Sequence, residues 1–288
     1  MPDDMIDRAR DFLLRNGRLL ERRLFASNFE GAPAPPAVEA LAAYQNADGG
    51  FGSGLEPDKR DPCSQPVDLQ FALETLDSID AATGPTVARA CDWLLTVTTD
   101  EGGVPFALPS VNAYPHAPWW AVAEGSPPAR INPTAAIAGM LLKHGVAHRW
   151  LGPATQFCWR AIEGAPNSEF HDLMPMIAFL DNVPDRARAN LALAAIAEVI
   201  AAPGVVALDV YAAGYVHKPL EWAPRPTSFC RKLFDDAVIE SHLHALAARQ
   251  QDDGGWPIFW EPISAGVALE WRGVVTLQAL RTLRAYGR

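Results

Sequence analysis

Cysteine is scarce in this chain, which has four cysteines in 288 residues, far apart and with no Cys-x-x-Cys pair. In a chain of this length, such usage indicates a reduced, intracellular protein rather than a disulfide scaffold. The charged, amphipathic start of the chain, residues 1–23, lacks the features of a signal peptide. No stretch approaches 18 uncharged apolar residues, so we expect no transmembrane segment and a cytoplasmic location.

Positive charge is also scarce: the chain has 24 Lys and Arg residues and 34 Asp and Glu residues, which gives a net charge of -10. Nucleic acids and anionic membranes are bound by basic surfaces, so we expect no nucleic-acid partner. The chain is long enough for a large buried core, and no linker divides it, so we expect a single domain over residues 1–288. The oligomeric state is open, and a homo-oligomer is compatible with this composition.

Strand-like alternation of apolar and polar residues is absent, whereas apolar residues recur at helical spacing through most of the chain. Besides an amphipathic helix in residues 1–23, this spacing predicts helices in 37–45, 67–79, 86–97, 133–145, 154–164, 169–183, 185–200, 235–250 and 273–287. Long loops rich in Pro, His and Trp lie at 105–131 and 203–233, and loops of such length are commonly functional. The predicted fold class is all-α.

Glycine pairs mark a repeat. Residues 45–51 (QNADGGF) and 250–256 (QQDDGGW) share Gln-x-x-Asp-Gly-Gly-aromatic. Residues 101–104 (EGGV) keep the glycine pair but have Glu in place of the Asp and Val in place of the aromatic residue. A phosphate-binding loop would follow a strand and carry a Lys-Ser/Thr, whereas these glycines follow predicted helices. We therefore interpret the motif as mechanical: a glycine takes positive φ, the Asp hydrogen-bonds the turn, the Gln reaches it, and the aromatic packs on a neighbouring helix. A spacing of about 50 residues is typical of stacked helical pairs.

This motif resembles the QW-type repeats of squalene and oxidosqualene cyclases and of the β subunits of protein prenyltransferases. The resemblance implies a single α/α toroid of roughly five to six helix pairs around a central cavity. It also implies a terpenoid-cyclase-like enzyme, an isomerase or a lyase, that takes an isoprenoid or other apolar substrate into a Trp-lined cavity. In that superfamily the helix before the glycines is outer and the helix after them is inner, so site residues are expected just after a glycine turn.

The catalytic motifs of these families are incomplete here. Where the cyclases have Asp-x-Asp-Asp, the nearest string is 233–236, and Leu233 stands in place of the first Asp. Asp235 and Asp236 precede a predicted helix, where an N-cap role is typical. The Gly-Cys-Gly-Glu-Gln motif of thioester domains, which share the toroid, is absent.

A zinc site is a further possibility that the resemblance to prenyltransferases implies. Asp61 and Cys63 follow the first glycine turn at about the place where those proteins have Asp-x-Cys, and a His would complete the site. Candidate third ligands are His116, His171 and His217. The alternative interpretation is an inert lone cysteine and no metal.

Two Glu-Pro pairs point to a site of a different kind. Glu56 and Glu261 each lie six residues after the second glycine of a well-kept repeat, and first and last repeats are neighbours in a ring. The predicted acid–base residues are Glu56, Asp58, Asp61, Glu261 and Glu270. The predicted substrate-binding residues are Arg60, Gln65, Asp68, His116, Trp119, Trp120, His171, His217, Trp222, Trp260, Trp271 and Arg272. The alternative is that these charges form a structural ion-pair network.

Two further functions fit the same pattern. Carbohydrate-active α/α barrels, lyases or hydrolases, also combine Gly-Gly-Trp turns, paired acids and stacking tryptophans. A non-catalytic toroid that binds a lipid or a partner protein would have no buried, proton-carrying carboxyl group. Whether a carboxyl group after a glycine turn is buried and protonated therefore distinguishes an enzyme from a binding protein.

Overall fold

The computed structural model describes residues 3–123, 125–164 and 168–288, and its regular structure is helical. Within these residues there are twelve α-helices and three short 3-10 helices, and pairing of extended backbone is limited to isolated bridges. The all-α prediction is confirmed. The chain divides into two compact units: a central unit (Ala34–Ile196) and a terminal unit (Met1–Pro33 with Ala197–Arg288).

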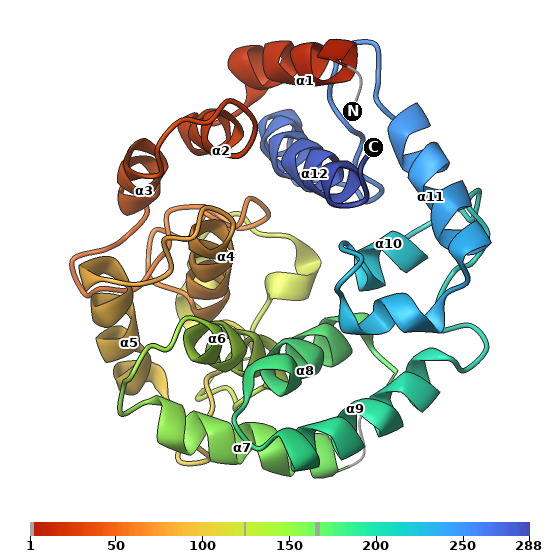
Figure 1. The fold of residues 1–288 in the computed structure, drawn as a ribbon. Helices are drawn as coiled ribbons and strands as arrows, with labels where there is room; N and C mark the ends of the chain where they lie inside the picture. The colour runs from red at the N-terminus through yellow and green to blue at the C-terminus, as the bar shows by residue number, and fades with distance from the viewer. Residues whose placement is uncertain (1–2, 124, 165–167) are drawn as a thin grey trace. The chain divides into compact units, whose positions relative to one another are not determined.

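The central unit is a stack of helices with α6 in its middle. Its helices are α3 (Pro35–Ala42), α4 (Pro66–Asp77), α5 (Pro85–Val97), η1 (Pro109–Ala113), η2 (Pro118–Trp120), α6 (Ile131–Lys143), α7 (Leu151–Glu163), α8 (Phe170–Asn182) and most of α9 (Arg186–Ile200). Helix α6 packs between α4 and α8, while α5 packs on α4 and α7 on α6 and α8 (Figure 1). Gly139 permits the close approach of α6 to α8, since a Cβ there would lie 2.4 Å from the Ala178 carbonyl oxygen.

The terminal unit joins the two ends of the chain. Its helices are α1 (Asp3–Asn16), α2 (Leu19–Phe29), α10 (Pro219–Trp222), η3 (Phe229–Leu233), α11 (Asp236–Ala248) and α12 (Ala265–Ala285). The long helix α12 packs against α1, α2 and α11 (Figure 1). Segments more than 200 residues apart in sequence thus share one core.

The glycine turns have the mechanical role predicted for them. Gly49 and Gly254 have φ of +96° and +93°, and Asp48 and Asp253 accept hydrogen bonds from the N–H of the second glycine at 2.9 and 3.0 Å. Backbone hydrogen bonds close both turns in the same way, and the turn at 99–103 repeats them. The glycine pair is therefore a structural corner in all three places.

Each well-kept turn is also fastened to another helix by its glutamine. The Nε2 of Gln45 donates to the Gly49 carbonyl and to the Thr86 carbonyl at the start of α5, both at 2.9 Å. Nε2 of Gln250 donates to the Gly254 carbonyl and, at 2.9 Å, to the Met5 carbonyl in α1. The last repeat therefore docks on α1 as the first repeat docks on α5.

Some elements differ from the sequence prediction. The helix expected over residues 1–23 is two helices, separated at Gly17 and Arg18. Helix α12 begins at Ala265 rather than at 273, because the Ser264 hydroxyl caps it by accepting from the Val267 N–H at 3.2 Å. The two long predicted loops carry only short helices in the part of the chain that is described.

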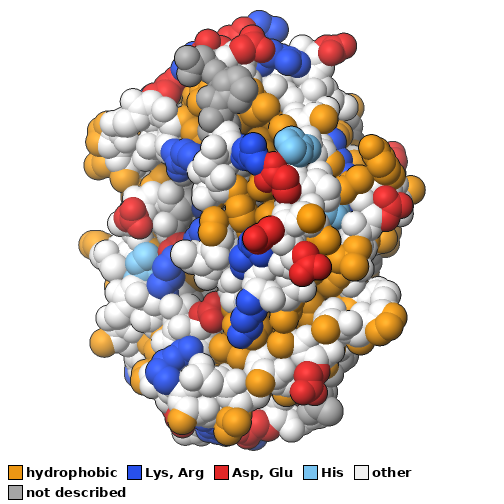
Figure 2. All heavy atoms as spheres, turned by 45° about the vertical axis from the view of Figure 1, so that its right-hand side comes forward, with side chains coloured by type: hydrophobic (Ala, Val, Ile, Leu, Met, Phe, Trp, Pro, Cys, Tyr) orange, Lys and Arg blue, Asp and Glu red, His pale blue; other side chains and the backbone are white. Residues whose placement is uncertain are grey.

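The surface has mixed charge on the face shown in Figure 2, where acidic and basic side chains are interspersed among hydrophobic ones. Exposed apolar side chains of the terminal unit include Tyr211, Tyr215 and Phe259. Among the described residues, no helix combines the length and apolarity needed to cross a bilayer.

Candidate functional site

The loop between the first glycine turn and α4 is polar and yet buried. We call residues 52–65 the acid loop. Its buried polar side chains, together with one at the start of α4, are Glu56, Asp58, Lys59, Asp61, Ser64, Gln65 and Asp68. The segment before η2 covers this loop, since the Arg60 N–H donates to the Pro115 carbonyl and the Ala117 N–H donates to the Asp58 carbonyl, both at 2.8 Å.

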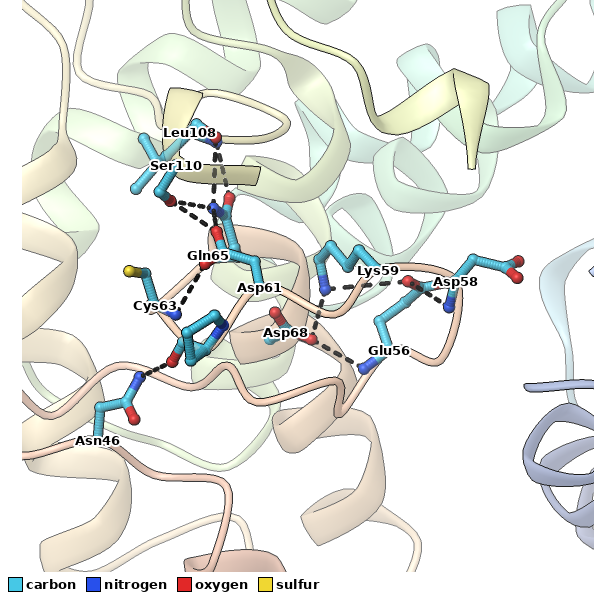
Figure 3. A network of polar contacts seen from close by, with 11 residues as sticks. Asn46, Glu56, Asp58, Lys59, Asp61, Cys63, Gln65, Asp68, Leu108 and Ser110 are labelled. Carbon is cyan, nitrogen blue, oxygen red and sulfur yellow. Dashed lines mark hydrogen bonds and ion pairs between the residues drawn. The ribbon is translucent and has the colours of Figure 1, made fainter. Parts of the chain in front are cut away.

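One half of the acid loop is a structural clamp centred on Asp61 (Figure 3). Its Oδ2 accepts from Gln65 Nε2 and from the Ser110 hydroxyl, both at 2.6 Å, and its Oδ1 accepts from the Cys63 N–H at 2.9 Å. Gln65 in turn accepts from the Leu108 N–H at 2.7 Å. Both oxygens of Asp61 are thus committed to holding the acid loop against η1, and Gln65, predicted to bind substrate, is part of the same clamp.

The other half of the loop is an ion cluster of Glu56, Lys59 and Asp68 (Figure 3). Lys59 Nζ lies 2.6 Å from Asp68 Oδ1 and 3.9 Å from Glu56 Oε2, and the lysine and aspartate side chains are fully buried. The backbone holds the acids in place: the Glu56 N–H donates to Asp68 Oδ1 at 2.8 Å, and the Asp58 N–H donates to Glu56 Oε2 at 3.1 Å. One buried cation therefore lies beside two buried carboxyl groups.

Aromatic rings lie against this cluster. Lys59 Nζ is 5.3 Å from the centre of the Trp120 ring, and Trp120 stacks on Phe106 with centroids 4.6 Å apart. A cation over an indole face is stabilised by the ring quadrupole, and both Lys59 and Trp120 are buried. The low-dielectric setting strengthens each charge interaction within the cluster.

Burial changes the proton affinity of the cluster. It raises the pKa of Glu56 to about 8, an effect that the nearby Lys59 opposes and that Asp58 and Asp68 reinforce. Burial likewise raises the pKa of Asp68, against the opposing effect of its ion pair with Lys59. A carboxyl with a pKa near 8 carries its proton at neutral pH, which is the property required of a general acid.

The possible zinc site at Asp61 and Cys63 is not supported by its donor atoms. Asp61 already accepts three hydrogen bonds, and burial and the neighbouring Asp61 raise the pKa of the Cys63 thiol, which disfavours the thiolate that zinc binds. His171 pairs with Glu169 at 2.9 Å. In the described part of the chain, no three His, Cys, Asp or Glu side chains are grouped as metal ligands. The residues present do not fit a zinc ion.

The remaining candidates of the central unit lie on the segment that covers the acid loop or on the loop itself. His116 is next to Lys59 through a backbone bridge, and its Nδ1 lies 2.7 Å from the Tyr114 carbonyl. Trp119 is half exposed, while Trp120 is buried. The Arg60 guanidinium lies over Gly54, where a Cβ would be 2.9 Å away.

In the terminal unit, Arg272 holds the last glycine turn. Its guanidinium pairs with both oxygens of Asp253 at 2.7 Å, donates to the Trp256 carbonyl at 3.2 Å, and lies over the Phe12 ring. The same pair lowers the pKa of Asp253. This geometry makes Arg272 a brace of the turn, and its predicted role in substrate binding stays a prediction.

The other candidates of the terminal unit are mainly aromatic. Trp260 is edge-on to Trp271 at 5.1 Å and to Tyr215 at 6.3 Å, and Tyr215 is edge-on to His217 at 5.2 Å. Trp222 is buried in the core, whereas Glu261 is exposed and Glu270 is half-buried on α12. Since Glu261 and Glu270 belong to a different unit from Glu56, the predicted convergence of these acids stays a prediction.

Sequence reasoning missed two members of the site. Lys59 stands in the hydrophilic run EPDKRD, which is typical of a solvated loop, so its complete burial had no signal in composition. Ser110 is 49 residues from the Asp61 that it contacts, and only the fold brings them together. A sequence signal was available for Glu56 and for Asp61, through their distances from the first glycine pair. No protein-family model matches the chain, and a search of the curated proteins found no significant match.

Proposed function

We propose that the chain is an acid–base enzyme of the terpenoid-cyclase-like kind, in which Glu56 donates a proton to an isoprenoid or other apolar substrate. The observation that carries this proposal is a buried carboxyl group whose pKa of about 8 keeps it protonated at neutral pH. A purely structural carboxylate, such as Asp61, would instead have its oxygens filled by donors. Glu56 retains a small exposed edge through which a proton can leave.

The toroid is part of this proposal, and the glycine turns support it. In a ring of helix pairs, each corner docks on the next outer helix, and the last corner docks on the first helix. Gly49 lies against the Arg89 carbonyl in α5, and Gly102 lies against the Pro153 carbonyl in α7. Gly254, in the last repeat, lies against the Arg8 carbonyl in α1. Each of these contacts lies within one compact unit, and together they support the proposed toroid.

The chemistry follows from the contacts of Glu56. When the carboxyl gives up its proton, the negative charge develops on an oxygen that already accepts the Asp58 N–H and lies 3.9 Å from Lys59. Both contacts stabilise the conjugate base, so proton release is assisted although the resting group is neutral. The aromatic pair Phe106 and Trp120 provides apolar surroundings in the same unit. A small apolar substrate and a cytoplasmic location complete the proposal.

The test uses two probes, squalene and geranylgeranyl diphosphate, each incubated with the purified protein in D2O. Transfer of the exchangeable Glu56 proton to carbon would place one deuterium in the product, which mass spectrometry detects. Glu56→Gln is expected to lower the rate by at least about 100-fold, because it removes the proton but keeps the shape. Glu39→Gln, an exposed glutamate of α3, is the matched control and should leave the rate unchanged. Equal activity of the two variants would contradict the role of Glu56.

A second candidate function rests on Trp119. This indole is half exposed, and it lies on η2, two residues after Ala117, whose N–H donates to the Asp58 carbonyl of the acid loop. An exposed indole near a protonated carboxyl is the arrangement with which carbohydrate-active enzymes stack a sugar ring and protonate its glycosidic oxygen. If Trp119→Ala and Glu56→Gln both abolish cleavage of a polysaccharide panel while the isoprenoid probes stay inert, this candidate replaces the first.

A further inference from the structure

Lys59 occupies a position between two carboxyl groups that are not equivalent. Its Nζ is in contact with Asp68 Oδ1 at 2.6 Å and stands back from Glu56 Oε2 at 3.9 Å. The lysine is fully buried, and a buried ammonium is costly unless its charge is matched. Asp68 matches it, and the second oxygen of Asp68, Oδ2, has no hydrogen-bond partner among the described residues. The ion pair is therefore held without a dense net of further donors around it.

We propose that Lys59 is a positioning residue that pairs with Asp68 while Glu56 carries its proton and moves to Glu56 once that proton has been given up. This inference rests on the proposed function of Glu56. In the resting state, neutral Glu56 with the Lys59–Asp68 pair has no net charge. After the proton passes to the substrate, Glu56 is an anion, and the flexible lysine side chain needs only a short movement to share its charge between two carboxylates. The cation formed on the substrate then loses a proton to water, and the solvent returns a proton to Glu56, which closes the cycle.

The charges around the cluster determine in which direction each substitution should shift the titration midpoint of Glu56. Asp58 and Asp68 face Glu56 as anions, Lys59 faces it as the cation, and Asp61 adds a negative charge near Asp68. Removing Lys59 takes away the charge that favours ionised Glu56. Removing the charge of Asp68 takes away a repulsive neighbour and releases Lys59 to pair with Glu56. The two changes should therefore move the titration of Glu56 in opposite directions, which loss of packing alone would not do.

The experiment is a titration of the side-chain carboxyls by NMR, with 13C-labelled glutamate in the full chain. Asp68→Asn is expected to lower the Glu56 midpoint by at least about one pH unit, and Lys59→Met is expected to raise it by a similar amount. Asn keeps the oxygen that accepts the Glu56 N–H, and Met keeps most of the volume of lysine. Glu56→Gln identifies the resonance, and the exposed Glu39 is an internal control whose midpoint should not move.

Lys59→Met leaves Asp68 buried without its partner, so a second variant guards against a failure to fold. The double variant Lys59→Met with Asp68→Asn removes the ion pair as a whole, a change that proteins often tolerate well. Lys59 influences Glu56 more strongly than Asp68 does, so the midpoint in the double variant should lie above that of the unchanged protein. It should also lie below the midpoint of Lys59→Met, if that variant folds.

Shifts of one sign in all variants, or no shifts, would overturn the role of Lys59. The outcome is separable from that of the proposed function. If the titrations shift as expected but Glu56→Gln matches Glu39→Gln on the probes, the enzyme proposal and the positioning role fail together, and only the electrostatic coupling stands. If Glu56→Gln is inactive but the titrations do not shift, Glu56 is the acid and the inference about Lys59 is wrong.

Discussion

At the scale of single residues, Glu56 links the candidate chemistry to the stability of the fold. Its folded pKa of about 8 lies above the ordinary value of 4.5, so the folded chain binds a proton that the unfolded chain releases. Between these two pH values stability must fall as the pH rises, by about 1.4 kcal/mol per pH unit for this one group. Below pH 4.5 the group is protonated in both states, and it has no such effect.

Glu56→Gln should therefore be nearly as stable as the unchanged protein at pH 4.5 and more stable by a few kcal/mol at pH 8. Urea unfolding of both proteins at pH values between 4.5 and 8 measures the difference. Glu39→Gln supplies the control, since Glu39 is exposed. Parallel stability curves for Glu56→Gln and the unchanged protein would show that Glu56 titrates normally.

Asp61 is a buried acid whose role we expect to be structural rather than catalytic. Asp61→Asn replaces one acceptor oxygen by an amide that donates, and it places this donor against Ser110 and Gln65 or against the Cys63 N–H. We expect a loss of about 1–3 kcal/mol in the free energy of unfolding, measured in urea. Ser110→Ala removes only one donor and should cost less. A loss of activity by Asp61→Asn with no loss of stability would return Asp61 to the catalytic residues.

Some residues of the candidate site could be predicted from the sequence, and others could not. Glu56 was located by counting from a glycine pair, since a repeat fixes the register of the residues after it. Lys59 could not be located, because a lysine among acids and prolines has the composition of a surface loop whether or not another segment covers it. The covering segment, which includes His116, is about 57 residues further on, and nothing local indicates the contact.

At the scale of elements, the glycine turns were the most predictable feature. Helical periodicity located nine of the helices because each buries one face, and the motif indicated what joins them. The break between α1 and α2 was missed since both helices are amphipathic and Gly17 is a weak interruption. The start of α12 was missed because its first two turns are partly exposed and carry few buried residues.

The turns give a matched pair of glycine substitutions. A Cβ at Gly254 would lie 2.0 Å from the Arg8 carbonyl oxygen, whereas at Gly204, with a similar φ of +87°, it would meet open space. Gly204→Ala is expected to cost about 1–2 kcal/mol from backbone strain alone. Gly254→Ala should cost at least about 2 kcal/mol more, because α1 must also move. Thermal unfolding at fixed pH measures both, and equal losses would mean that the corner does not dock tightly on α1.

At the scale of the whole molecule, the two compact units predict two patterns of local opening. Phe12 in the terminal unit and Phe179 in the central unit are both fully buried phenylalanines. Each Phe→Ala change should destabilise its own unit by about 3–5 kcal/mol. Hydrogen exchange followed by mass spectrometry should show faster exchange in α11 and α12 for Phe12→Ala, and in α6 and α8 for Phe179→Ala. Uniform acceleration across the chain in both variants would indicate a single cooperative unit.

The hydrogen bonds between the last glycine turn and α1 have a consequence for the order in which the chain acquires its structure. Arg8 donates to the carbonyl of Gln251, a residue synthesised 243 positions later. At ordinary translation speeds, α1 waits roughly 10–50 s for its partner, while the central unit emerges complete in the meantime. During that interval α1 can pack only against α2 and lacks α12 and the last glycine turn, so we expect the nascent chain to be most exposed to aggregation, and to binding by chaperones, at this helix.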